Sequence, residues 1–246
     1  MPRWLLIDNS NTRTKFALGG PQRLDDWLAR LPTAEITADS LAALLGPLEF
    51  DAALVASVVP DTAAVIKACL SPRGPVHFLT SASNLGMAID FDDPSQVGSD
   101  RLANAIGVEA RYGSPAIVID FGTAVTFDVI SSKPAYCGGV IAPGLGAMTG
   151  YLFRRTALLP QIELAEPRHA IGKTTEEAMQ SGAVFGYRGL VRGILEKLLP
   201  EIDGHPVVVA TGGDAVLIGR SMPEIDHIDP LITLEGLRLA AIRNLP

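Results

Sequence analysis

Two segments, far apart in the sequence, each place an aspartate at the end of an apolar run. In the central segment, Asp120 follows such a run, and a turn containing Gly122 and Thr123 precedes the next one. Apolar β-branched residues favour a strand, and glycine permits a tight turn whose backbone N–H groups can approach a phosphate. A carboxylate at this strand end can hold a cation that offsets the charge of a triphosphate. Taken alone, the segment also fits an ordinary hairpin with a solvated aspartate.

A second copy of this order lies near the amino terminus. Leu5 to Ile7 form the apolar run, Asp8 follows it, and polar residues as far as Lys15 precede another apolar run. Two such copies predict a duplicated architecture with a nucleotide between two halves. We place the boundary in the turn around Gly113, which gives an N-terminal domain of residues 1–113 and a C-terminal domain of residues 114–246.

A third segment, Gly98-Ser99-Asp100-Arg101, leads into an apolar stripe that is typical of a helix. The helix dipole favours an acid in the first turn, which is the simplest explanation of Asp100. The dipole does not favour a base there, so Arg101 indicates an anionic partner such as a carboxylate.

Composition excludes several classes of protein. A hydrophobic content of 48% with 19% charged residues excludes a disordered chain, and no apolar run approaches the length of a membrane span. A net charge of -7 argues against a general nucleic-acid binder. The two cysteines and four histidines show no metal-ligand spacing. Because the amino terminus runs directly into a strand-like segment, we expect no cleaved signal peptide and a cytoplasmic protein.

The remaining patterns predict an α/β protein. Buried strands are expected over residues 53–59 and 207–210, and helices over 24–31, 41–45, 61–68 and 231–244. Thr174 and Glu177 are expected to form a capping box before a long helix that runs from Ala178 to Leu198. The glycine-rich stretch from Gly138 to Gly146 lacks the lysine of a P-loop. A tight connection between strands and a wall where backbone approaches a substrate both remain open for this stretch.

In their order along the chain, these segments resemble the motifs of the type III pantothenate kinases, which belong to the acetate and sugar kinase, Hsp70 and actin superfamily. Residues 8–15, 98–101, 120–123, 139–144 and 211–213 carry the resemblance, which spans essentially the whole chain. It implies two ribonuclease-H-like (actin-like ATPase) domains with the active site in the cleft between them. It also implies ATP-dependent phosphorylation of pantothenate, the first step of coenzyme A biosynthesis.

The resemblance implies a role for each matched residue. Asp100 is expected to be the general base, Arg101 to hold the substrate carboxylate, and Asp120 to be the ligand of a monovalent cation, K⁺ or NH₄⁺. Asp8 and Asp120 can position Mg²⁺ around the triphosphate. Nucleotide contacts are implied for Asp8, Asn9, Ser10, Asn11, Thr12, Arg13, Thr14, Lys15 and Thr123. Substrate contacts are implied for Phe91, Gly98, Ser99, Asp100, Arg101 and Thr175. The resemblance also implies a homodimer.

Three residues depart from the family pattern. Ser10 stands where the motif has glycine, so the turn must keep φ negative or tolerate strain, which puts phosphate affinity in question. Phe91 replaces the usual tyrosine and lacks its hydroxyl, a loss of about 1 kcal/mol if that hydrogen bond is made. Ser99 replaces the common alanine and is expected to be harmless. Ser10 and Phe91 keep open a non-catalytic nucleotide-binding accessory or regulatory protein of the same fold. A kinase for another small hydroxy acid is a second alternative, which the Gly98–Arg101 motif distinguishes from a pantothenate kinase.

Overall fold

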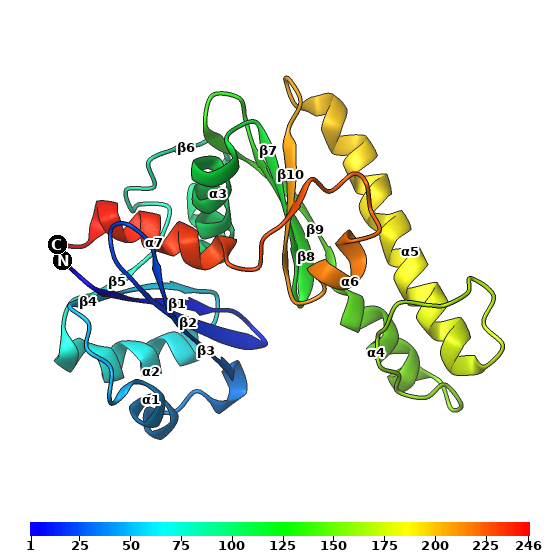
Figure 1. The fold of residues 1–246 in the computed structure, drawn as a ribbon, viewed down its shortest axis with the longest axis horizontal. Coiled ribbons are helices and arrows are strands. Elements are labelled where there is room, and N and C mark those ends of the chain that lie inside the picture. Colours follow the sequence, from blue (N-terminus) through cyan, green and yellow to red (C-terminus); the bar gives the residue numbers. More distant parts are fainter. The chain divides into compact units, whose positions relative to one another are not determined.

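The computed structural model describes all 246 residues, which form two compact units (Figure 1). The first unit comprises Met1–Tyr112, Pro134–Cys137 and Leu231–Pro246, and the second comprises Gly113–Lys133 and Gly138–Pro230. The division into domains of residues 1–113 and 114–246 stays a prediction. The compact units differ from it chiefly because residues 231–246 pack with the first unit.

Two glycines explain why the last helix joins the first unit. Helix α7 (Ile232–Asn244) packs against α3 (Ser99–Tyr112), and a Cβ on Gly236 would lie 1.8 Å from the carbonyl oxygen of Ala103. A Cβ on Gly107 would lie 2.4 Å from the carbonyl oxygen of Ile232. The two backbones can approach this closely because neither glycine has a side chain.

The first unit is built on a five-stranded sheet of order β3-β2-β1-β4-β5. Its strands are β1 (Trp4–Asn9), β2 (Arg13–Gly19), β3 (Leu24–Pro32), β4 (Ala52–Ser57) and β5 (Val76–Phe78). Strand β1 runs antiparallel to β2 and parallel to β4. Helices α1 (Ala38–Leu45) and α2 (Pro60–Leu70) contribute to the core on one face of this sheet, and α7 contacts β1 and β4 from the other (Figure 1). Short 3₁₀ turns are formed by Thr33–Glu35, Ser71–Arg73, Pro94–Gln96 and Leu199–Glu201.

The predicted helix over residues 24–31 is wrong, because these residues form strand β3. Trp27, Ala29 and Leu31 pack against the core of the first unit, while Leu28 and Arg30 are exposed. This alternation has the period of two that characterises a half-buried strand. Pairing with β2 from Arg13 to Gly19 fixes the strand at the edge of the sheet. The predicted helices that became α1, α2, α5 and α7 are confirmed.

The second unit repeats the strand order of the first. Its strands are β7 (Ala116–Phe121), β8 (Ala124–Ile130), β9 (Ala135–Pro143), β10 (Val207–Gly212) and β11 (His227–Ile228), in the order β9-β8-β7-β10-β11. Strand β7 is antiparallel to β8 and parallel to β10, as β1 is to β2 and β4. Residues 135–136 of β9, which count with the first unit, pair with β6 (Ala88–Ile89). The predicted duplication is therefore confirmed at the level of topology.

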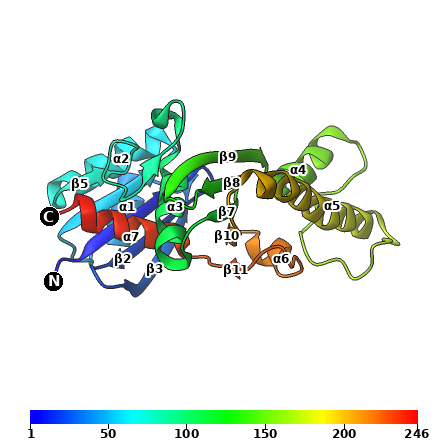
Figure 2. The ribbon, with the colours of Figure 1, turned by 90° about the horizontal axis from the view of Figure 1, so that it is seen from above.

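Three helices complete the second unit: α4 (Leu145–Arg155), α5 (Thr175–Leu198) and α6 (Ala215–Gly219). Helix α5 is continuous through its four internal glycines, and α4 lies alongside it (Figure 2). One face of α5 packs on the sheet through Val184, Tyr187 and Val191, which are fully buried. None of the helices combines the length and apolar content needed to cross a membrane.

Candidate active site

The first aspartate hairpin holds its carboxylate by two side-chain contacts. Asp8 lies opposite Lys15 in the β1–β2 register, and Lys15 Nζ is 3.0 Å from Asp8 Oδ2. Ser10 Oγ donates a 2.7 Å hydrogen bond to Asp8 Oδ1. Asp8 is only 2% exposed, so its charge depends on these partners. The predicted hairpin at the end of β1 is confirmed.

The serine that replaces glycine in this turn fits without strain. No residue other than glycine has a positive φ, so Ser10 adopts a conformation that any residue can take. The sequence left open a negative φ or a strained turn at Ser10, and the structure has the negative φ. The side chain of Ser10 moreover supplies a hydrogen bond to Asp8 that glycine could not.

Asn9 is the centre of a buried hydrogen-bond network. Its Nδ2 donates to Thr14 Oγ1 at 2.8 Å, and its Oδ1 accepts from Ser57 Oγ at 2.6 Å and from Thr62 Oγ1 at 2.8 Å. The network extends through Thr14 Oγ1 to Thr33 Oγ1, 3.0 Å away. The predicted nucleotide residues therefore separate into two groups. Asn9 and Thr14 are buried and shape the hairpin, whereas residues 11–13 lie exposed at its tip.

The third motif forms the start of α3, as predicted. Asp100 is the second residue of the helix, and its Oδ1 accepts a 2.8 Å hydrogen bond from the backbone N–H of Arg101. A Cβ on Gly98 would lie 2.7 Å from the same carboxylate oxygen. Glycine at this position thus leaves the space that the Asp100 carboxylate occupies. Ser99 is not an inert replacement, because its Oγ donates to the carbonyl oxygen of Ser57 at 3.1 Å.

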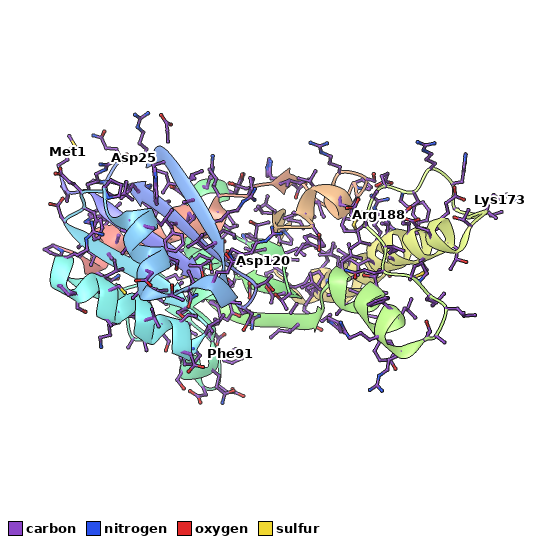
Figure 3. The ribbon with its side chains drawn as sticks, turned by 90° about the horizontal axis from the view of Figure 1, so that it is seen from below. Met1, Asp25, Phe91, Asp120, Lys173 and Arg188 are labelled. Atoms are coloured by element: carbon purple, nitrogen blue, oxygen red, sulfur yellow. The ribbon has the colours of Figure 1, made fainter.

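Phe91 and Arg101 meet at a tyrosine that the sequence reasoning missed. The Arg101 guanidinium carbon lies 5.7 Å from the Tyr136 ring centroid, a cation–π distance. The rings of Phe91 and Tyr136 are tilted by 59°, with centroids 6.3 Å apart. Phe91 is 36% exposed at the surface of the first unit (Figure 3), whereas Tyr136 is fully buried. An aromatic residue within a strand gave no signal beyond that of a core position.

The second aspartate hairpin is shaped by glycines that follow it in the sequence. The Gly144 N–H donates to the carbonyl oxygen of Thr123 at 3.1 Å. A Cβ on Gly144 would lie 2.4 Å from the carbonyl oxygens of both Gly122 and Thr123. The glycine-rich stretch thus includes one position, Gly144, where backbone lies directly against the hairpin. At Gly144 this stretch is a tight connection against the hairpin, and its approach to a substrate stays a prediction.

Asp120 lies over the turn that follows β10. Gly212 has φ of +94°, a conformation that favours glycine, and a Cβ there would lie 2.5 Å from Asp120 Oδ1. Thr211, which pairs with Asp120 in the sheet register, is fully buried, and its hydroxyl has no hydrogen-bond partner. Asp120, labelled in Figure 3, therefore lies opposite a residue with a buried hydroxyl on the adjacent strand.

Thr175 lies elsewhere in the second unit, at the start of α5. Its neighbour Thr174 caps the helix by accepting from the Glu177 N–H at 3.2 Å. The Glu177 carboxylate reaches the N–H of Lys173 rather than that of Thr174, so the predicted capping box is only partly formed. Thr175 lines a cavity of about 950 Å³ between α4 and α5, whose other walls include Met148, Tyr151 and Met179.

The second unit contains a buried arginine paired with an exposed glutamate, and a buried tyrosine. Arg188, labelled in Figure 3, is 6% exposed. It donates to both oxygens of Glu166 at 2.8 and 2.6 Å and to the carbonyl oxygens of Leu217 and Ile218. Hydrogen bonds from Arg188 lower the pKa of Glu166. Burial raises the pKa of Tyr187, whose hydroxyl donates to the carbonyl oxygen of Pro143, next to Gly144.

The predicted site residues fall into both units. Those of the first hairpin, Phe91 and the Gly98–Arg101 motif belong to the first unit, and Asp120, Thr123 and Thr175 belong to the second. Within the first unit, Arg101 and Phe91 share Tyr136, and Ser99 contacts Ser57. Within the second, Asp120 and Thr123 occupy one hairpin. Their individual roles stay predictions.

Comparison with known proteins identifies the family. Residues 4–197 match the family model for type III pantothenate kinase. A type III pantothenate kinase of Akkermansia muciniphila is 55% identical, covering 98% of this chain and 99% of its own. A type III pantothenate kinase of Methylacidiphilum infernorum is 41% identical, covering 96% of this chain and 86% of its own.

Solved structures agree on the fold. A candidate 2-dehydro-3-deoxygalactonokinase from Sinorhizobium meliloti superimposes with a TM-score of 0.62 at 14% identity, covering 99% of this chain and 97% of that one. Such a low identity supports the fold alone, which is that of the sugar kinases and actin-like ATPases, as predicted. With its motifs, its duplicated topology and its full-length relatives, the chain belongs to the type III pantothenate kinase family.

Proposed function

We propose that the protein transfers the γ-phosphoryl group of ATP to the terminal hydroxyl of pantothenate, with Asp100 as the general base. The observation that carries this proposal is the start of α3, where a carboxylate, an arginine and a space-making glycine occur together within a full-length family match. The product is 4'-phosphopantothenate, and the reaction opens the route to coenzyme A.

The two charged residues of this motif divide the work on the acceptor. A carboxylate within hydrogen-bond reach of the attacking hydroxyl orients it and accepts its proton as the new bond forms. An arginine binds a carboxylate through paired N–H donors, so Arg101 fixes the acid end of the acceptor. Phosphoryl transfer requires in-line placement above all, and two anchored ends of the acceptor supply it.

The nucleotide requires oxygen ligands for its cations, and the two aspartate hairpins carry them. Asp8 in the first unit and Asp120 in the second each offer the carboxylate oxygens that Mg²⁺ prefers, and Mg²⁺ would neutralise charge on the triphosphate. We assign a monovalent cation, K⁺ or NH₄⁺, to Asp120. The buried and unpartnered hydroxyl of Thr211 on the neighbouring strand supports this assignment, because a cation would satisfy that oxygen.

A homodimer is part of the proposal, and α5 supports it. Gly182, Gly186, Gly189 and Gly193 recur along the helix, and a Cβ on any of them would meet no atom within 4 Å. Large apolar side chains of the same unit are exposed, among them Tyr151 at 60% and Phe153 at 46%. Exposed apolar surface beside an open glycine stripe suits close packing against a second helix.

The proposed reaction also implies a location. A kinase that uses ATP for the first step of coenzyme A biosynthesis would work in the cytoplasm.

A non-catalytic accessory role is not favoured. Ser10, one of the two residues that kept this alternative open, fits its turn and adds a hydrogen bond to Asp8. A chain without catalytic function would also have no use for costly groups such as the buried Asp8 carboxylate. Pantothenate is supported over other small hydroxy acids by the relatives at high identity and coverage.

The test is the substitution Asp100→Asn, which keeps the shape of the side chain and removes the base. We expect kcat for pantothenate-dependent ADP formation to fall by roughly 10²- to 10⁴-fold, with nucleotide affinity changed by less than about twofold. Asp93→Asn is the matched control, since Asp93 is an exposed carboxylate that bonds Ser95 in the same unit.

Two results would contradict the proposal. Near-normal turnover by the Asp100→Asn protein would remove Asp100 as the base. If the unchanged protein formed no ADP from pantothenate with either K⁺ or NH₄⁺ present, the assigned reaction itself would be wrong.

A further inference from the structure

The hydrogen bonds of the first hairpin do not stop at the hairpin. Ser57, the last residue of β4, lies opposite Asn9 in the parallel β1–β4 register and donates from Oγ to Asn9 Oδ1 at 2.6 Å. The carbonyl oxygen of Ser57 accepts from Ser99 Oγ at 3.1 Å. Ser99 is the first residue of α3 and directly precedes Asp100.

We propose that Ser57 and Ser99 are positioning residues that join the nucleotide hairpin to the acceptor motif within the first unit. We call this pair the serine bridge. The inference rests on the proposed function, because it assigns the two ends of the bridge to the two substrates. Neither serine touches the reacting atoms; each acts through a neighbour, Asn9 at one end and Asp100 at the other.

The bridge is fixed rather than adaptable. The Ser57 hydroxyl also accepts from the Val59 N–H at 3.2 Å, and the Val58 N–H donates to the carbonyl oxygen of Asn9 at 3.1 Å. The chain leaving β4 is therefore tied to the end of β1 at two points. Ser99 is only 7% exposed, so water can replace its hydrogen bond only with difficulty.

The same geometry explains why the start of α3 needs a tether. The α3 N-terminus is where Asp100 must meet a hydroxyl, and small displacements of a catalytic group have large effects on rate. The packing around Asp100 is already tight, since a Cβ on Gly98 would lie 2.7 Å from its carboxylate and 3.5 Å from Val58 Cγ1. The Ser99 hydrogen bond fixes the position of the first turn of α3 relative to the end of β4 within this limited space.

Two substitutions separate the ends of the bridge. Ser99→Ala removes only the bond to α3, and we expect the dissociation constant of pantothenate to rise about twofold to tenfold while the affinity for a non-hydrolysable ATP analogue stays within about twofold. Ser57→Ala removes the bond to Asn9, and we expect the analogue to bind about twofold to tenfold more weakly. Calorimetric titration of the analogue and of pantothenate measures both affinities without turnover.

A conservative variant and a matched control distinguish positioning from general destabilisation. Ser99→Thr keeps the hydroxyl and should restore the affinity for pantothenate. Ser40→Ala also removes a serine hydroxyl from the first turn of a helix in the first unit, where it accepts from the Thr37 N–H in the capping box of α1, and should lower the melting temperature without changing either affinity.

The inference is overturned if Ser99→Ala and Ser57→Ala change the two affinities no more than Ser40→Ala does, or change both equally. The analogue titrations remain informative whatever the acceptor proves to be. A protein that binds the analogue and loses that affinity with Ser57→Ala, yet does not phosphorylate pantothenate, would contradict the proposed function and leave the hairpin end of the serine bridge in place.

Discussion

The hairpin that carries Asp8 is supported by side chains, whereas the hairpin that carries Asp120 is supported by backbone that approaches it at glycines. Thr14 and Ser57 each hydrogen-bond to Asn9 at the first. Gly144 and Gly212 lie against the second, with no room for a Cβ. The two sheets share one strand order, but the contacts that hold the hairpin in place differ between them. The first hairpin should therefore fail when polar atoms are removed, and the second when atoms are added.

The largest effect is expected from Gly144→Ala. The added Cβ would lie 2.4 Å from two carbonyl oxygens of the second hairpin, so backbone must move. We expect a loss of roughly 3 kcal/mol in the free energy of unfolding and a nucleotide affinity at least about tenfold weaker. Denaturant melts and analogue titration measure the two effects.

Gly146→Ala is the matched control for this prediction. It lies two residues further on, in α4, and its added Cβ would meet nothing within 4 Å. It should stabilise the helix by about 0.5 to 1 kcal/mol. Equal losses from the two variants would show that the backbone at Gly144 does not support the hairpin.

The next largest effect is expected from Asn9→Ala in the first hairpin. The change leaves the buried hydroxyl of Thr14 and the half-buried hydroxyls of Ser57 and Thr62 without their shared partner, at a cost of roughly 2 to 3 kcal/mol. Equilibrium unfolding measures it. Asn11→Ala, at the exposed tip of the same hairpin, should change stability by less than about 0.5 kcal/mol. If Asn9→Ala proved as mild as Asn11→Ala, support by side chains would be the wrong description.

A smaller effect is expected from Ser10→Gly, which installs the residue that the family motif usually has. Since Ser10 already has a negative φ, glycine relieves no strain, adds freedom to the unfolded chain and removes the hydrogen bond to Asp8. Stability should fall by about 0.5 to 1 kcal/mol, and nucleotide affinity should not improve. Tighter binding of the ATP analogue by this variant would indicate strain in the serine turn.

The smallest effect is expected from removing the charge of Glu166, which pairs with Arg188 in the second unit. Arg188 lowers the pKa of Glu166, so the stabilisation from this pair is present above the usual glutamate pKa of about 4.3 and is lost as pH falls through the lower folded pKa. Glu166→Gln should flatten the dependence of the melting temperature on pH below about pH 5, and Glu163→Gln on the same loop should not. Identical pH profiles for the two variants would contradict this assignment.

The parts that sequence reasoning predicted are those that local rules dictate. Asp8 and Asp120 end apolar runs, and both became strand ends beside turns. The first turn of α3 followed from Gly98 and the apolar stripe after it. Residues 24–31 misled because an edge strand with one buried face contains apolar residues that a helical period also fits. The strand-like alternation of Trp27, Ala29 and Leu31 was present in the sequence, but it covered fewer residues than the helical spacing over residues 24–31.

The contacts that sequence reasoning could not reach join residues distant along the chain. Tyr136 meets Arg101 and Phe91 only through pairing of β6 with β9. Ser57 meets Ser99 across 42 positions, and neither serine belongs to a spacing that predicts contact. Ser99 was expected to be harmless on the basis of its size. Its hydrogen bond became visible only when the end of β4 was placed against the start of α3.

The packing of α7 on α3 has a consequence for the order in which the protein can be made. All the residues of the second unit are synthesised before α7, whereas the first unit begins with β1 and needs residues 231–246 for its final layer. On the ribosome, the glycine face of α3 at Gly107 must wait, uncovered, until the complementary face at Gly236 emerges. The half of the protein that starts first is thus the half that finishes last.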